Sequence, residues 1–166
     1  MRVRLNDRAM STLPAMLDTR IPPPVVMLLV GAGMWVIARC MPPLAFEFPL
    51  QRPLWLALAV AGLSCELLPA MRFFRARTTV NPLRPQNTSQ LVIDGLNRYS
   101  RNPMYLGQLL LLVAWAVFLG HVLSAVLPLL FALYITRFQI LPEERVLEAR
   151  FGDAYARYRA RVRRWL

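Results

Sequence analysis

The sequence predicts an all-α polytopic membrane protein with about four transmembrane helices and a cytoplasmic helical tail at its C-terminus. Hydrophobic residues make up 57% of the 166-residue chain, and the mean hydropathy is +0.40, which is more apolar than is usual for a soluble domain of this size. The apolar residues gather in four long runs with arginines between them. We therefore expect residues 1–166 to form a single membrane domain.

The four runs are expected to cross the bilayer as helices, because about 20 mostly apolar residues span its hydrocarbon layer. They cover residues 24–41, 54–71, 104–119 and 122–138. The last two runs meet at Gly120-His121, a turn so short that it predicts an antiparallel helical hairpin. Pro128 predicts a kink inside the fourth run.

Beyond the fourth run, the sequence predicts a helical tail in two parts. Pro142-Glu143-Glu144 is a favourable helix start, because proline suits the first turn and carboxylates face the positive end of the helix dipole. Gly152 is expected to divide the tail into two helices. Its basic end, residues 157–164 with Trp165, suits an interfacial helix that lies on anionic lipid headgroups.

The positions of the arginines predict the orientation in the membrane. Arginines are frequent before the first run, between the second and third, and after the fourth, whereas the other connections hold only Arg39, Arg52 and His121. By the positive-inside rule, segment 1–23 and the C-terminus lie in the cytoplasm. Residues 1–20 lack the apolar core of a signal peptide, so the first run should stay as an anchor. We expect an integral protein of a bacterial inner membrane.

Several partner classes are not indicated by this sequence. The net charge of +11 does not point to nucleic acid, because the basic residues lie between apolar runs and not along one polar face. Cys40 and Cys65 lie in or beside apolar runs without metal-ligand spacing, and there is no phosphate-binding glycine loop. We expect membrane lipids as partners, and neither nucleic acid nor metal.

Two polar clusters lie on the expected cytoplasmic side. Residues 94–107 lead into the third run, and residues 139–144 leave the fourth. Because these runs form a hairpin, the two clusters should meet at one membrane surface. Asn102-Pro103 opens a helix whose free amides can hold an anionic group. Glu143 and Glu144 offer acceptors for hydroxyls or for an ammonium group.

Each of these features also has a structural interpretation. Arg98 and Arg101 can serve as topology anchors, and the two glutamates can act as a helix cap. Tyr99 and Tyr105 can be interfacial aromatics. Glu66, an acid within the second run, is costly there and indicates a function, unless it reaches the nearby interface or pairs with an arginine. A non-enzymatic membrane scaffold therefore stays open as an alternative.

The two clusters also share an order of residues with a known family. The pattern is Arg101-Asn102-Pro103-Met104-Tyr105-x-Gly107, a short hairpin, and then Glu143-Glu144-x-x-x-Leu147-x-x-x-Phe151-Gly152-x-x-Tyr155-x-x-Tyr158. This pattern resembles the isoprenylcysteine carboxyl methyltransferases and the related phospholipid N-methyltransferases. The resemblance covers residues 77–162, which we expect to be the catalytic half.

The resemblance implies an S-adenosylmethionine-dependent methyltransferase whose lipophilic or lipid substrate enters from the bilayer. The implied catalytic residues are Arg101 and Glu143. The implied cofactor-binding residues are Gln90, Leu91, Val92, Asn97, Asn102, Pro103, Met104, Tyr105 and Glu143. Because methyl transfer from a sulfonium depends mainly on positioning and charge, a missing catalytic histidine or cysteine is no objection.

The chain departs from the family pattern at three positions. Asn102 stands where the family usually has histidine, and Asn97 stands where it often has tyrosine. Gln139 stands where the carboxyl methyltransferases have an arginine that orients the substrate carboxylate, so we expect Gln139 to contact a different substrate. Sterol reductases have a similar C-terminal half and are the alternative enzyme class, in which Arg98 and Arg101 would bind the phosphates of NADPH.

Overall fold

The computed structural model describes residues 21–75 and 93–166. Within these residues the chain is helical apart from connections and one isolated β-bridge between Ala45 and His121. This confirms the expected all-α fold. Gln90, Leu91 and Val92, together with most of segment 1–23, lie outside the described residues.

The expected membrane spans are present as helices. The first three are α2 (Pro23–Cys40), α3 (Gln51–Arg75) and α4 (Pro103–Leu119). The fourth is longer than expected, because several helical pieces follow one another without a break: η4 (Ser124–Val126), α5 (Leu127–Ile135), the π-helical turn η5 (Thr136–Ile140) and α6 (Leu141–Phe151). Three stretches, Pro23–Cys40, Gln51–Met71 and Ser124–Phe151, are long and apolar enough to cross a membrane, and α4 is a shorter apolar helix.

Prolines mark the beginnings of most of these helices. Pro23 and Pro103 lie in the first turn of α2 and α4, where the missing N–H costs nothing. Pro128 and Pro142 lie in the first turn of α5 and α6, where one kind of helical turn passes into another. Pro128 lies where the 3-10 helix η4 passes into α5, and the kink expected there stays a prediction. The fourth span is also irregular at the π-helical turn η5, a feature often found at functional sites.

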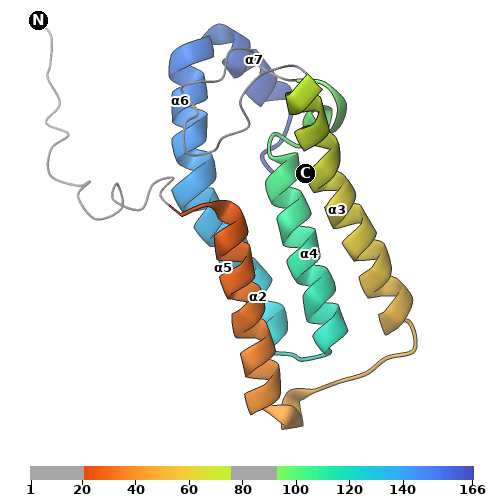
Figure 1. The fold of residues 1–166 in the computed structure, drawn as a ribbon. Coiled ribbons are helices and arrows are strands. Elements are labelled where there is room, and N and C mark those ends of the chain that lie inside the picture. The colour runs from red at the N-terminus through yellow and green to blue at the C-terminus, as the bar shows by residue number, and fades with distance from the viewer. Residues whose placement is uncertain (1–20, 76–92) are drawn as a thin grey trace, which may run out of the picture.

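Helix α4 lies at the centre of the bundle, between α2 and α3, and also contacts α5 (Figure 1). The closest approach is between α3 and α4, where Gly62 faces Gly107. A Cβ atom built on Gly107 would lie 2.7 Å from the carbonyl oxygen of Gly62. Small residues let membrane helices pack this closely. The buried apolar side chains of α2, α4, α5 and η5 form the main core: Val26, Met34, Tyr105, Leu112, Ala116, Phe131, Ile135 and Ile140.

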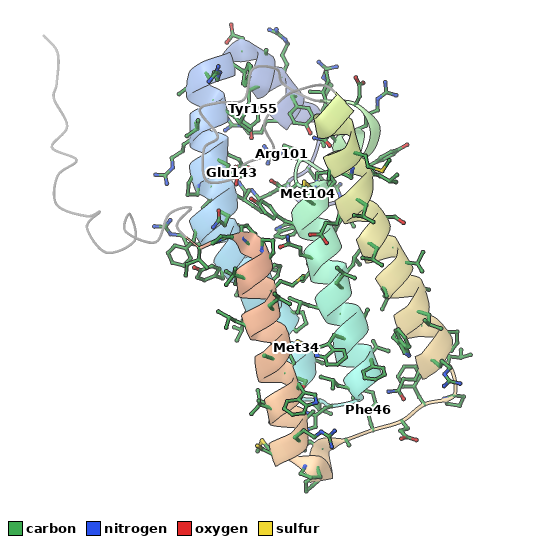
Figure 2. All side chains as sticks on the ribbon, viewed as in Figure 1. Met34, Phe46, Arg101, Met104, Glu143 and Tyr155 are labelled. Carbon is green, nitrogen blue, oxygen red and sulfur yellow. The ribbon has the colours of Figure 1, made fainter. Side chains whose placement is uncertain are left out.

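The hairpin turn locks the end of the bundle that is predicted to be extracytoplasmic. Gly120 ends α4 in the left-handed conformation, with φ of 56°. His121 is fully buried, and its Nε2 lies 2.9 Å from the carbonyl oxygen of Met41. Ser124 donates a 2.9 Å hydrogen bond to the carbonyl oxygen of Met34, at the same end of the molecule (Figure 2). These contacts fasten α2 to the hairpin, so His121 has a structural role.

The other end of the bundle is covered by α6, α7 (Asp153–Arg161) and the 3-10 helix η3 (Gly95–Arg98) (Figure 1). Gly152, with φ of 47°, separates α6 from α7, as expected. The interfacial helix expected over 157–164 is only partly correct. Helix α7 ends at Arg161, and Val162 is already extended, with φ of −121° and ψ of 130°.

Candidate active site

The beginning of α4 and the beginning of α6 meet at one end of the bundle, as the hairpin predicted. Tyr105 donates a 2.6 Å hydrogen bond to Oε1 of Glu143. Figure 2 shows Arg101, Met104 and Glu143 at this end, far from Met34 and Phe46 at the other. The structure therefore brings together the two polar clusters that are far apart in the sequence.

Glu144 lies at the centre of a second network and forms ion pairs with two arginines. Its Oε1 is 3.1 Å from Nη2 of Arg101 and 3.0 Å from Nε of Arg164, and its Oε2 is 2.8 Å from Nη2 of Arg164. The Arg101 and Glu144 side chains are only 9% and 10% exposed. Such a buried pair holds its groups in place, because separating them would leave an uncompensated charge away from water.

The extended C-terminal segment, residues 162–166, packs against the beginning of α4. The carbonyl oxygen of Arg163 accepts a 3.0 Å hydrogen bond from the backbone N–H of Arg101. The carbonyl oxygen of Arg164 accepts a 3.0 Å bond from Nδ2 of Asn102 and a 3.4 Å bond from Oγ of Ser100. The side-chain amide of Asn102 is therefore engaged by the chain itself.

Trp165 anchors the same segment in the bundle. Its indole N–H lies 3.3 Å from Oγ1 of Thr136, the first residue of the π-helical turn, and its ring packs against the main core. The C-terminal segment consequently joins the beginning of α4 to the turn that precedes Glu143.

Asn97 and Tyr158 join η3 to α7. Tyr158 donates a 2.7 Å hydrogen bond to the carbonyl oxygen of Asn97, which is itself buried. Burial, with a smaller contribution from Tyr155, raises the pKa of Tyr158 to about 12. The hydroxyl therefore stays protonated at neutral pH and keeps this bond. Tyr155, only 1% exposed, packs beside Tyr158.

Gln139 lies in the π-helical turn and is fully buried. Its Nε2 donates a 2.7 Å hydrogen bond to the carbonyl oxygen of Ile21, just before α2. Its Oε1 has no hydrogen-bond partner within the described part of the chain. The residue thus ties the beginning of α2 to the site and has a free acceptor.

Arg101 has the clearest unmet bonding capacity in the site. Only its Nη2 reaches Glu144, whereas its Nε and Nη1 are buried without a hydrogen-bond partner among residues 21–75 and 93–166. An unpaired buried guanidinium donor is costly, and a bound acceptor such as a carboxylate would satisfy it. Arg98 differs, because its side chain is 71% exposed and pairs with Asp94.

The roles of three residues of the site were not predicted from the sequence. Glu144 pairs with two arginines and is not a free acceptor, and Arg164 and Ser100 bond to other residues of the site. The Glu143-Glu144 pair was visible, but which glutamate faces which partner depends on the rotation of α6. Arg164 belongs to a run of basic residues that is typical of membrane surfaces, and nothing in the sequence separated it from its neighbours.

Comparison with known proteins agrees with this architecture. The model of the phospholipid methyltransferase family matches residues 55–154. An uncharacterized protein of Haemophilus influenzae is 51% identical over 63 residues, which are 38% of this chain and all of that protein. The protein-S-isoprenylcysteine O-methyltransferase of Schizosaccharomyces pombe is 37% identical over 75 residues, or 43% of this chain and 30% of that enzyme. No solved structure matches. Since the family model covers more than half of the sequence, this integral membrane chain belongs to the phospholipid methyltransferase family.

Proposed function

We propose that the protein transfers a methyl group from S-adenosylmethionine to a lipophilic small molecule or lipid at the cytoplasmic membrane face. The observation that carries this proposal is Arg101, whose Nε and Nη1 are buried in the same site as Glu143 and have no hydrogen-bond partner among the described residues. A buried donor pair and a partly buried carboxylate in one site suit an amino-acid group, which has a carboxylate and an ammonium. Membership of a methyltransferase family supports the same cofactor.

The residues present fit such a cofactor. Arg101 would bind the carboxylate of its methionine part through Nε and Nη1, while Nη2 stays with Glu144. Glu143 would accept hydrogen bonds from the ammonium group or from ribose hydroxyls, with Tyr105 holding the carboxylate in place. Their neighbours in η3 and at the beginning of α4 are also assigned to the cofactor under this proposal: Asn97, Asn102, Pro103 and Met104.

The chemistry needs positioning more than acid or base strength. When bound, the cofactor supplies a methyl carbon on a positively charged sulfur, and that carbon bonds to a lone pair of the acceptor as the C–S bond breaks onto sulfur. The chain's part is to align the two reactants and to exclude water. The ion pairs of Glu144 with Arg101 and Arg164 keep the beginning of α4 rigid for that purpose.

Calorimetric binding of S-adenosylhomocysteine to the detergent-purified protein tests the proposal. We expect saturable binding, and a tenfold to hundredfold weaker affinity in Glu143→Ala, which is about the effect of losing one hydrogen bond to a charged group. Glu148→Ala is the matched control, because Glu148 is on the same helix but 48% exposed and paired with Arg159.

A folded protein that does not bind S-adenosylhomocysteine would refute the cofactor assignment. NADPH is the comparison ligand, and its saturable binding in place of S-adenosylhomocysteine would favour a reductase. Binding of neither ligand would favour a scaffold. Equal affinities of the Glu143→Ala and Glu148→Ala variants would show that Glu143 is not part of the cofactor site.

A further inference from the structure

An apolar groove runs along the bundle between α2 and α4. It has a volume of about 470 Å³, which is within the range of sites for small molecules. Its lining is almost entirely apolar and consists of Met27, Leu28, Gly31, Ala32, Trp35, Leu111, Leu112 and Trp115. Nε1 of Trp115 is already bonded to the carbonyl oxygen of Gly31 at 3.1 Å. The groove therefore suits a hydrocarbon chain.

The face of α4 that lines the groove at Leu111 and Trp115 also carries residues nearer the candidate active site. Residues three, four, seven and eight apart share a helix face, so Met104, Gln108, Leu111 and Trp115 form one stripe along α4. At about 1.5 Å of rise per residue, Trp115 lies roughly 16 Å from Met104, a distance that an extended lipid chain can cover. The stripe is apolar at its far end and polar at Gln108.

Gln108 and Glu66 form a polar pair at this boundary. Nε2 of Gln108 donates a 3.2 Å hydrogen bond to Oε1 of Glu66 on α3. Gln108 is only 3% exposed, and its Oε1 has no hydrogen-bond partner among the described residues. Glu66 forms no ion pair within the described part of the chain. Within the described part of the chain the pair therefore offers an acceptor without a donor, Oε1 of Gln108, beside an acid that is costly at this depth unless it has a function.

We infer that the groove holds the hydrocarbon chain of the methyl acceptor and that Glu66 and Gln108 bind its polar head, selecting a head that donates hydrogen bonds. An amine has such a head, whereas a carboxylate brings only acceptors and a negative charge that Glu66 would repel. This inference rests on the proposed function, because the lipid is a methyl acceptor only if the protein is a methyltransferase. Binding of the lipid in the groove does not depend on the cofactor. Glu66 and Gln108 are specificity-determining residues under this assignment.

A transmembrane helix of a second copy is the competing occupant, and the polar pair argues against it. The backbone N–H groups of a helix are bonded within that helix, so the apolar face of a neighbouring helix would leave Oε1 of Gln108 without a donor. A single chain with a polar head satisfies both the apolar groove and the free acceptor.

Tryptophan quenching by lipids with brominated chains tests the inference directly, because Trp35 and Trp115 line the groove. The full chain is placed in phosphatidylcholine nanodiscs and titrated with a brominated long-chain amine and with the carboxylate of the same chain. We expect the amine to quench saturably and to bind with at least tenfold higher affinity than the carboxylate. Glu66→Gln should reduce this preference to less than threefold.

Two groove variants provide the matched pair. A Cβ on Gly31 would lie 3.8 Å from Leu112, so the larger side chain of Gly31→Leu fits on the helix and fills the groove. Ala61→Leu adds a similar volume to α3, where Ala61 is exposed and outside the groove lining. We expect Gly31→Leu to abolish saturable quenching and Ala61→Leu to leave it unchanged, with both variants still binding S-adenosylhomocysteine.

The outcomes separate this inference from the proposed function. Quenching that does not saturate, or that survives Gly31→Leu, would overturn the groove assignment even if S-adenosylhomocysteine binds. Equal affinity for amine and carboxylate would overturn the role of Glu66 and Gln108. A dimer in the nanodisc that Gly31→Leu dissociates would assign the groove to a second copy and overturn the inference. Failure to bind S-adenosylhomocysteine would count only against the proposed cofactor.

Discussion

Neighbouring residues of this site have different partners because a helix turns about 100° per residue. Glu143 faces Tyr105 on α4, and Glu144 faces Arg101 and Arg164. One carboxylate accepts a hydrogen bond from a neutral phenol, and the other is neutralised by two guanidinium groups. The first is available to a ligand, while the second holds the beginning of α4 and the C-terminal segment together.

Removing the charge of Glu144 should therefore destabilise the fold. In Glu144→Gln, the buried Arg101 loses its carboxylate, and we expect a loss of about 3 kcal/mol, as for other broken buried ion pairs. Thermal unfolding in detergent, followed by circular dichroism, measures the effect as a lower Tm.

The exposed pair between Glu148 and Arg159 is the control for this experiment. Both side chains are nearly half exposed, at 48% and 45%, so Glu148→Gln should cost about 0.5 kcal/mol or less. Equal losses of stability in the two variants would contradict the view that the Glu144 network holds the site together.

The pairing of α3 with α4 depends on two glycines that let the backbones approach. Gly62 and Gly107 face one another, and each would place a Cβ within 2.9 Å of the other's carbonyl oxygen. Because these contacts are with backbone atoms, a side chain there cannot be accommodated by a change of rotamer. The same contact fixes how α3 and α4 are aligned along their axes, and therefore where Glu66 meets Gln108.

Gly107→Ala should push α3 away from α4. Overpacking of this kind costs about 1–3 kcal/mol, and the shift should also lengthen the bond between Gln108 and Glu66. Gly33→Ala is the matched control, since its Cβ would lie at an ordinary 3.7 Å from Leu127. It should be neutral or stabilising by up to about 1 kcal/mol, because alanine has the higher helix propensity.

Thermal unfolding of the two alanine variants measures this difference. A Gly107→Ala protein as stable as Gly33→Ala would show that α3 and α4 can separate without cost.

At the scale of the whole molecule, the two ends of the bundle differ in their residues. At one end, which we call the lock end, hydrogen bonds of His121 and Ser124, including one to the carbonyl oxygen of Met41, join α2 to the hairpin turn. The other end holds the polar residues of the candidate site (Figure 2). The arginine distribution predicts that the site end is cytoplasmic, and this orientation stays a prediction.

Cysteine labelling in bacterial cells tests the orientation. Cys40 is exposed at the last residue of α2, at the lock end. In a Cys65→Ala background, a membrane-impermeant maleimide should label Cys40 from outside intact cells, whereas Arg157→Cys in a Cys40→Ser, Cys65→Ala background should react only after lysis. The reverse pattern would place the site on the outer face.

Much of the architecture could be read from the sequence, because the bilayer imposes a length on each apolar run and arginines are rarely carried across it. The runs that became α2, α3 and α4, the hairpin at Gly120 and the helix boundary at Gly152 all follow from local composition and backbone preference. The meeting of Tyr105 with Glu143 follows from the same hairpin, and the family pattern pointed to both residues.

The sequence by itself therefore determined the spans, the turn and the place of the candidate site. Only the tertiary structure decided that Pro128 lies in the first turn of α5, that Arg164 reaches Glu144, and that Gln108 meets Glu66. These features depend on the rotation of each helix about its axis and on the path of residues 162–166 after α7 ends. Both are set by packing between segments far apart in the chain, which a local pattern of residues does not record.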